Sequence, residues 1–156
     1  GWSEFSNHST RQTLISAAIR ELDQNNKYLT DMDKAYEQIS NLDQVYLLPT
    51  FYYNGIQAIQ ASPLFTKKDE SLLNSVSSYL YNVNPTNDSI LKLNIIFSGK
   101  SSSLQHKKET YGSFYNSKLL QRFRKKHEDL QEQLIKLKRG SVVVQIGLRL
   151  MTVVSN

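Results

Sequence analysis

The chain has 156 residues, of which 39% are hydrophobic and 21% charged, so it holds enough apolar material for the core of one domain. It contains no cysteine, which excludes disulfide bonds, thiolate metal ligands and cysteine nucleophiles. The sequence has no run of about 18 uncharged apolar residues that could span a bilayer, and we expect the chain as given to be soluble.

The formal net charge of +5 is concentrated in one part of the chain. Between His106 and Arg139 there are ten Lys and Arg residues and four Asp and Glu residues, so this segment carries +6 and the rest of the chain −1. An acidic partner, such as nucleic acid or anionic lipid, would therefore have to bind this segment.

A long helix is predicted over residues 10–41, after an N-terminal lead of residues 1–9. Ser9 and Gln12 fit a capping box at its start. Asn25 fills the one gap in a heptad series of apolar residues, where a buried asparagine typically fixes the register or the partner of a helix. Asn25 is therefore a candidate polar residue of the core. The apolar members of the series are Ile15, Ala18, Leu22, Leu29, Met32, Tyr36 and Ile39.

Shorter elements are predicted in the middle of the chain. One helix is expected over residues 50–61. A second, over residues 66–83, ends before Pro85, because the residue preceding a proline is pushed out of the helical region. Residues 90–97 fit both a strand and a helix face, and the serine-rich residues 98–103 are predicted to form a loop.

A second long helix is predicted over residues 104–138, and Gly112 is a point where it can bend or split. Residues 142–154 alternate in hydrophobicity and are rich in β-branched side chains, which predicts a strand or an extended tail within residues 140–156. The heptad series of the helix consists of Leu120, Phe123, His127, Leu130, Leu134 and Leu137.

These elements predict a mostly α protein, a single helical domain over residues 1–156 in which the two long helices supply most of the core. If residues 90–97 and the tail were both strands, the chain would instead form a βαβ unit. The bundle is favoured because the strongest periodicities are helical and two strands make a poor sheet. The residues expected to be buried are Leu22, Leu29, Met32, Leu73, Val76, Leu80, Leu120, Phe123, Leu130 and Leu134.

His127 is the second candidate polar residue of the core, because it lies in the seam of the C-terminal long helix. If the two long helices pack together, Asn25 and His127 could hydrogen-bond to each other. We assign no catalytic residue, because the sequence has no recognisable pair of catalytic carboxylates and no setting for a nucleophile. We also expect no metal and no other cofactor, because the three histidines are scattered. Residues 98–101 (Ser-Gly-Lys-Ser) match only the end of a phosphate-binding loop, which favours a surface turn.

A basic face is predicted on the second long helix, opposite its apolar seam. Tyr111, Phe114 and Tyr115 lie just before it and could stack on nucleic-acid bases. Acidic residues four positions away, as in the pairs Lys125–Asp129, Arg124–Glu128 and Glu132–Lys136, are expected to neutralise much of the charge, so nucleic acid is not the favoured partner. The candidate cations of this face are Lys118, Arg122, Lys125 and Lys126.

The segment Ala17-Ala18-Ile19-Arg20-Glu21-Leu22-Asp23-Gln24-Asn25, followed by helices ending at residues 79–84, resembles the soluble part of small uncharacterised bacterial membrane proteins. The resemblance covers about residues 11–97. In that family a helix with a Glu-Leu-x-x-Asn signature closely follows an N-terminal membrane span. The resemblance implies that Trp2 and Phe5 lie near a membrane interface, although only Arg11 and Arg20 stand where a basic run normally follows the span.

Together these observations predict a non-enzymatic helical interaction or sensing module. It would be the soluble portion of a membrane-associated bacterial protein, located on the cytoplasmic side and anchored by a segment outside the given sequence. Its partner would be another protein or a second copy of the chain. The alternative is a nucleic-acid-binding domain that uses the basic helix over residues 107–139.

Overall fold

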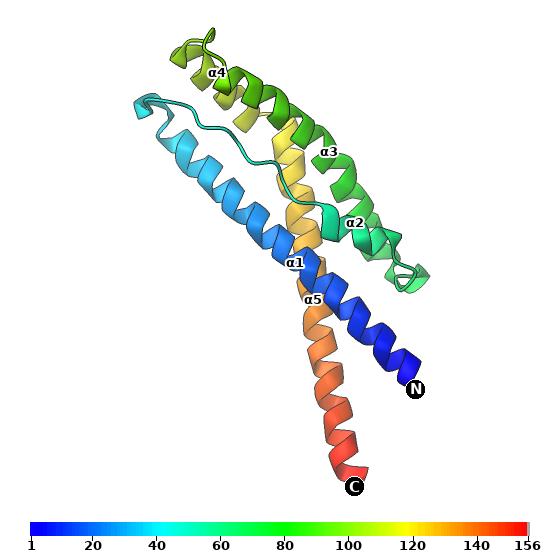
Figure 1. The fold of residues 1–156 in the computed structure, drawn as a ribbon. Helices are drawn as coiled ribbons and strands as arrows, with labels where there is room; N and C mark the ends of the chain where they lie inside the picture. Colours follow the sequence, from blue (N-terminus) through cyan, green and yellow to red (C-terminus); the bar gives the residue numbers. More distant parts are fainter. Residues whose placement is uncertain (156) are drawn as a thin grey trace.

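The computed structural model describes residues 1–155, with side chains at residues 1–141, 146, 147 and 149–151. Within residues 1–155 every regular element is a helix, which confirms the mostly α bundle (Figure 1). The elements are α1 (Trp2–Glu37), η1 (Ile39–Asn41), α2 (Asn54–Ala61), η2 (Lys67–Asp69), α3 (Glu70–Ser98), α4 (Leu104–Tyr115) and α5 (Lys118–Ser155).

The core lies between α1, α3 and α5, and the contact between α3 and α5 is the most extensive. The apolar heptad positions of α5 from Leu120 to Leu134 are buried, as predicted, and so are Leu22, Leu29 and Met32 of α1. On α3, Val76 and Leu80 are buried as predicted. Leu73 is only partly buried, because the neighbouring Leu72 occupies the core position.

The predicted end of a helix before Pro85 is wrong, because α3 continues through this proline to Ser98. Proline in a helix interior costs about 3 kcal/mol, since its ring clashes with the preceding turn and it donates no backbone hydrogen bond. The buried face of α3 continues from Leu72 to Phe97, with Thr86 and Asn87 as its polar members, and its burial offsets that cost. Residues 90–97 are therefore helical, which decides against the βαβ alternative.

The predicted helix over residues 104–138 is two helices, α4 and α5. The break falls at Asn116 and Ser117 and not at Gly112. The Ser117 hydroxyl oxygen accepts a hydrogen bond from the Leu120 amide at 3.2 Å, so Ser117 caps the start of α5. Short polar side chains of this kind form hydrogen bonds with nearby backbone groups in place of the helical ones, so they are favoured at helix ends.

Both chain ends differ from the sequence prediction. The N-terminal lead over residues 1–9 is helical, because α1 begins at Trp2, and Ser9 lies inside the helix. The predicted strand or extended tail is also wrong, because α5 continues through the region to Ser155. β-branched residues lower helix propensity only slightly, and a single strand without a partner has no ladder to join, so continuing an existing helix is favoured.

Residues 42–53 form an extended segment between α1 and α3 (Figure 1). The sequence placed the start of a helix at residue 50, whereas α2 begins only at Asn54. In the extended segment, Val45 and Phe51 are buried, and Tyr46 and Leu47 are exposed. This segment carries no internal backbone ladder, so its buried N–H and C=O groups need partners from the helices.

Candidate functional site

Asparagine side chains supply the partners for the extended segment. The Asn87 amide accepts a hydrogen bond from the Phe51 N–H at 2.8 Å and donates to the Phe51 carbonyl at 2.9 Å. Asn94, two turns further along α3, pairs with both backbone groups of Leu48 at 2.8 Å. A primary amide carries a donor and an acceptor side by side, so each asparagine imitates one residue of a neighbouring β-strand.

Asn25 holds the same segment from the side of α1. Its amide accepts a hydrogen bond from the Tyr52 N–H at 2.8 Å and donates to the Tyr52 carbonyl at 3.2 Å. The Asn25 amide also donates to the hydroxyl oxygen of the buried Tyr79 at 2.8 Å, and that hydroxyl donates to the Tyr52 carbonyl at 2.6 Å. Burial raises the pKa of Tyr79, so the hydroxyl stays protonated and remains a donor.

His127 is 2% exposed, and its Nε2 lies 3.0 Å from the Leu22 carbonyl oxygen. Because a carbonyl oxygen only accepts, Nε2 carries the proton in this contact. The predicted hydrogen bond between Asn25 and His127 is therefore not formed. Asn25 bonds to Tyr52 and Tyr79 instead, and the His127 ring lies 6.3 Å from the Tyr79 ring. Asn25, Tyr79 and His127 therefore form a buried polar cluster, in which Asn25 and Tyr79 bond to each other and to the Tyr52 backbone and His127 contacts the Leu22 carbonyl.

We expect the stability of the protein to fall as the pH drops below about 6.5. Burial lowers the pKa of His127, and the weaker opposing effects come from the Leu22 carbonyl and Asp23. The unfolded chain therefore binds a proton at a higher pH than the folded chain does. Between the two pKa values the free energy of unfolding should decrease by up to about 1.4 kcal/mol per pH unit.

Urea unfolding at about pH 7.5 and about pH 5 measures this loss. His127→Gln removes the titrating group and should reduce the loss, whereas His106→Gln, at an exposed position, should leave it unchanged. An equal loss in the wild type and in His127→Gln would contradict the assignment.

The sequence reasoning missed Asn87, Asn94 and Glu21. Asn87 and Asn94 are seven residues apart on the inward face of α3, the same signal that singled out Asn25. The Glu21 carboxylate accepts a hydrogen bond from the Gly55 N–H and so holds the start of α2 against α1. Burial raises the pKa of Glu21, and its backbone hydrogen bonds to Gly55 and Ile56 oppose that rise.

On the predicted basic face, Lys118, Arg122 and Lys125 are exposed, and Lys126 is half-buried. Two of the predicted ion pairs form, Lys125–Asp129 at 3.0 Å and Lys136–Glu132 at 3.1 Å. The third does not form as predicted. Arg124 pairs with Asp33 of α1 at 2.7 Å and not with Glu128. These pairs neutralise part of the positive charge along α5.

The aromatic residues beside the basic face are not available for base stacking. Tyr111 and Phe114 are buried in the core. Tyr115 stacks on Tyr36 with ring centroids 4.1 Å apart and donates its hydroxyl to Asp33 at 2.7 Å. An interaction of α5 with nucleic acid would therefore rest on cations alone.

Ser98 ends α3, and residues 99–101 begin the turn that leads to α4. Helix occupies the positions where a phosphate-binding loop would begin, so the surface turn that we expected is what the structure has. In the part of the chain that the structure describes, no three His, Cys, Asp or Glu residues lie close enough to hold a metal ion. No helix among the described residues is both long and apolar enough to cross a bilayer.

Comparison with family models, curated proteins and solved structures found no match.

Proposed function

We propose that this chain is a non-enzymatic helical interaction module, the part of a membrane-associated bacterial protein that lies outside the bilayer. In this proposal the start of α1 and the end of α5 face the membrane. The observation that carries it is that the first turns of α1 and the last turns of α5 both expose large apolar side chains, and that both termini lie at the same end of the molecule (Figure 1). These side chains are Trp2, Phe5, Ile146, Leu150 and Met151.

Trp2 is 85% exposed and Phe5 68%, and their rings are stacked with centroids 6.3 Å apart. Large aromatic side chains with this exposure are costly in water and favourable at a membrane interface, where tryptophan is enriched. A contact of 3.1 Å between Ser141 and His8 brings α5 against the first turns of α1. The exposed Arg149 adds a cation that anionic lipid would attract.

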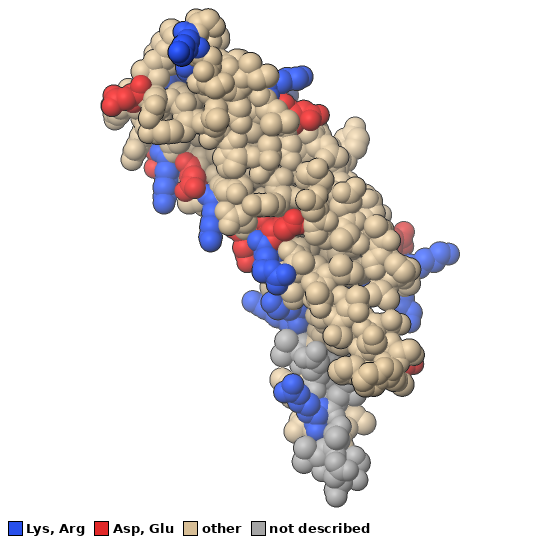
Figure 2. Space-filling model, viewed as in Figure 1, with Lys and Arg blue, Asp and Glu red and all other residues tan. Residues whose placement is uncertain are grey.

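The opposite half of the molecule supports a role in protein contacts. Figure 2 shows a broad area without charged side chains over α3 and the extended segment. Tyr81, Leu91 and Ile95 are exposed on the outer face of α3, together with the charged Asp88 and Lys92. Interfaces between proteins are enriched in aromatic residues such as tyrosine, so this face is the proposed site of a protein partner or of a second copy.

Fluorescence of Trp2 tests the proposed orientation, because Trp2 is the only tryptophan in the chain. Adding vesicles of phosphatidylcholine and phosphatidylglycerol should shift its emission to shorter wavelength, since the indole would move from water into the interface. The signal should weaken when Phe5 is replaced by Ser, because the apolar area at that end becomes smaller.

The matched control moves the tryptophan to the other half of the molecule. The double variant Trp2→Phe and Tyr81→Trp keeps an aromatic residue at the membrane-facing end and places the reporter on the exposed face of α3. Its emission should not change on addition of vesicles. A shift at position 81 with none at position 2 would reject the proposed orientation, and no vesicle binding at all would reject the membrane-facing end.

A further inference from the structure

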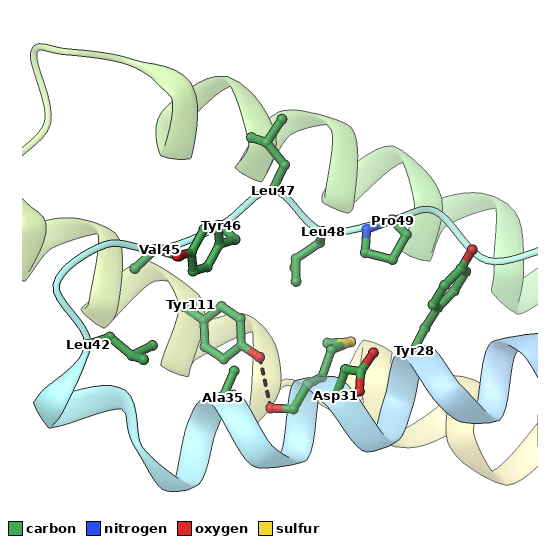
Figure 3. Close-up of a pocket in the computed structure, with 11 residues that line it drawn as sticks. Tyr28, Asp31, Ala35, Leu42, Val45, Tyr46, Leu47, Leu48, Pro49 and Tyr111 are labelled. Atoms are coloured by element: carbon green, nitrogen blue, oxygen red, sulfur yellow. Dashed lines mark hydrogen bonds between the residues drawn. The ribbon is translucent and has the colours of Figure 1, made fainter.

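A cavity of about 260 Å³ lies between α1, α4 and the extended segment (Figure 3). Its floor comes from α1 and α4, and residues 42–49 cover it. Its lining includes Asp31, Met32 and Ala35 of α1, Tyr111 of α4 and apolar side chains of the extended segment. None of these residues is used by the membrane-facing end or by the outer face of α3.

The size and walls of the cavity favour a small ligand with one ring. An apolar cavity of about 150 Å³ holds one benzene molecule, so about 260 Å³ accommodates a ring with a short chain. The walls are mainly aliphatic and aromatic. The Tyr111 hydroxyl donates to the Met32 carbonyl at 2.8 Å, so this hydroxyl is already satisfied and the tyrosine offers its ring to a ligand.

The charge of the residues that line the cavity indicates which polar group the ligand should carry. Among the residues that line the cavity, only Asp31 is charged, and its exposed side chain lies on α1 (Figure 3). Lys27 and Lys34 are neighbours of Asp31 along α1, but no ion pair of Asp31 is formed within the described residues. A carboxylate beside tyrosine rings attracts a cation by charge and through the negative ring faces, and repels an anion.

We propose that this cavity binds a small arylalkyl ammonium compound, with its ring among the apolar side chains under the extended segment and its ammonium group at Asp31. The site uses residues of α1, α4 and the extended segment, which the amides of Asn87, Asn94 and Asn25 hold in place. The cavity thus depends on an unusual feature of the fold, a backbone segment held by side chains and not by a strand.

Calorimetric titration of the whole chain with three probes of similar size tests the proposal. The probes are 2-phenylethylammonium, the neutral 2-phenylethanol and the anionic phenylacetate. The cation should bind with a Kd below about 1 mM, which is reasonable for a ligand of this size. It should bind at least about tenfold more tightly than phenylacetate, with the neutral probe between them. A neutral probe that binds as tightly as the cation would overturn the proposal, as would binding of none of the three.

Three variants locate the site. Asp31→Asn, at an exposed position, should remove the preference for the cation but keep the affinity for 2-phenylethanol. Ala35→Phe should fill the cavity and abolish binding of all three probes, provided that its helical circular dichroism matches the wild type. Asp43→Asn is the control, because this carboxylate belongs to the extended segment that covers the cavity but does not line the cavity. An unchanged preference in Asp31→Asn, or an equal loss in Asp43→Asn, would overturn the assignment of the ammonium group to Asp31.

Discussion

Replacing Asn87 by Ala should lower the free energy of unfolding by about 2 to 5 kcal/mol. The substitution leaves the N–H and C=O groups of the buried Phe51 without their partners, which lie 2.8 and 2.9 Å away in the folded protein. Each unpaired buried backbone group costs about 1 to 3 kcal/mol, and water cannot easily reach this position. Urea unfolding followed by circular dichroism measures the loss.

Asn84→Ala is the matched control, because Asn84 lies on the same helix with its side chain exposed. Alanine has a higher helix propensity than asparagine, so this variant should be unchanged or more stable by a few tenths of a kcal/mol. Equal destabilisation by the two substitutions would mean that the amide contacts with Phe51 contribute nothing particular to stability.

Replacing Leu130 by Ala should cost about 2 to 5 kcal/mol, because the side chain is fully buried in the heptad seam of α5 and the substitution leaves a cavity. The same change at Leu91, which is 56% exposed on α3, should alter the free energy of unfolding by about 0.5 kcal/mol or less. The comparison uses one type of substitution at two levels of burial. A small effect at Leu130 would show that the seam of α5 is not a major part of the core.

The heptad pattern predicted most of the core positions that α1 and α5 supply. Leu22 and Leu130 are both fully buried where their seams predicted, and the same pattern identified Asn25 and His127 as buried polar residues. The pattern works because one face of a long helix must be covered, and the period of the apolar residues tells which face. It could not tell which partners the polar residues find, because these lie on distant parts of the chain. Asn25, for example, bonds to Tyr52 and Tyr79.

The errors have physical causes of the same kind. Local propensity ends a helix before Pro85 and makes residues 142–154 a strand, but the burial of the long inward face of α3 and the extension of an existing helix outweigh these local preferences. The extended segment could not be predicted either. Residues 50–53 read locally as the start of a helix, whereas distant groups stabilise their extended backbone, namely the amides of Asn87 and Asn25 and the Tyr79 hydroxyl.

Hydrogen exchange of the amides in the extended segment tests most directly the claim that asparagine side chains hold it in place. The N–H groups of Leu48, Phe51 and Tyr52 donate to Asn94, Asn87 and Asn25, so they should exchange slowly. For Leu47 and Thr50, no hydrogen bond of the amide is found within the described residues, and these should exchange rapidly. The account predicts slow exchange at residues 48, 51 and 52 and rapid exchange at residues 47 and 50. Uniformly rapid exchange across the segment would contradict it.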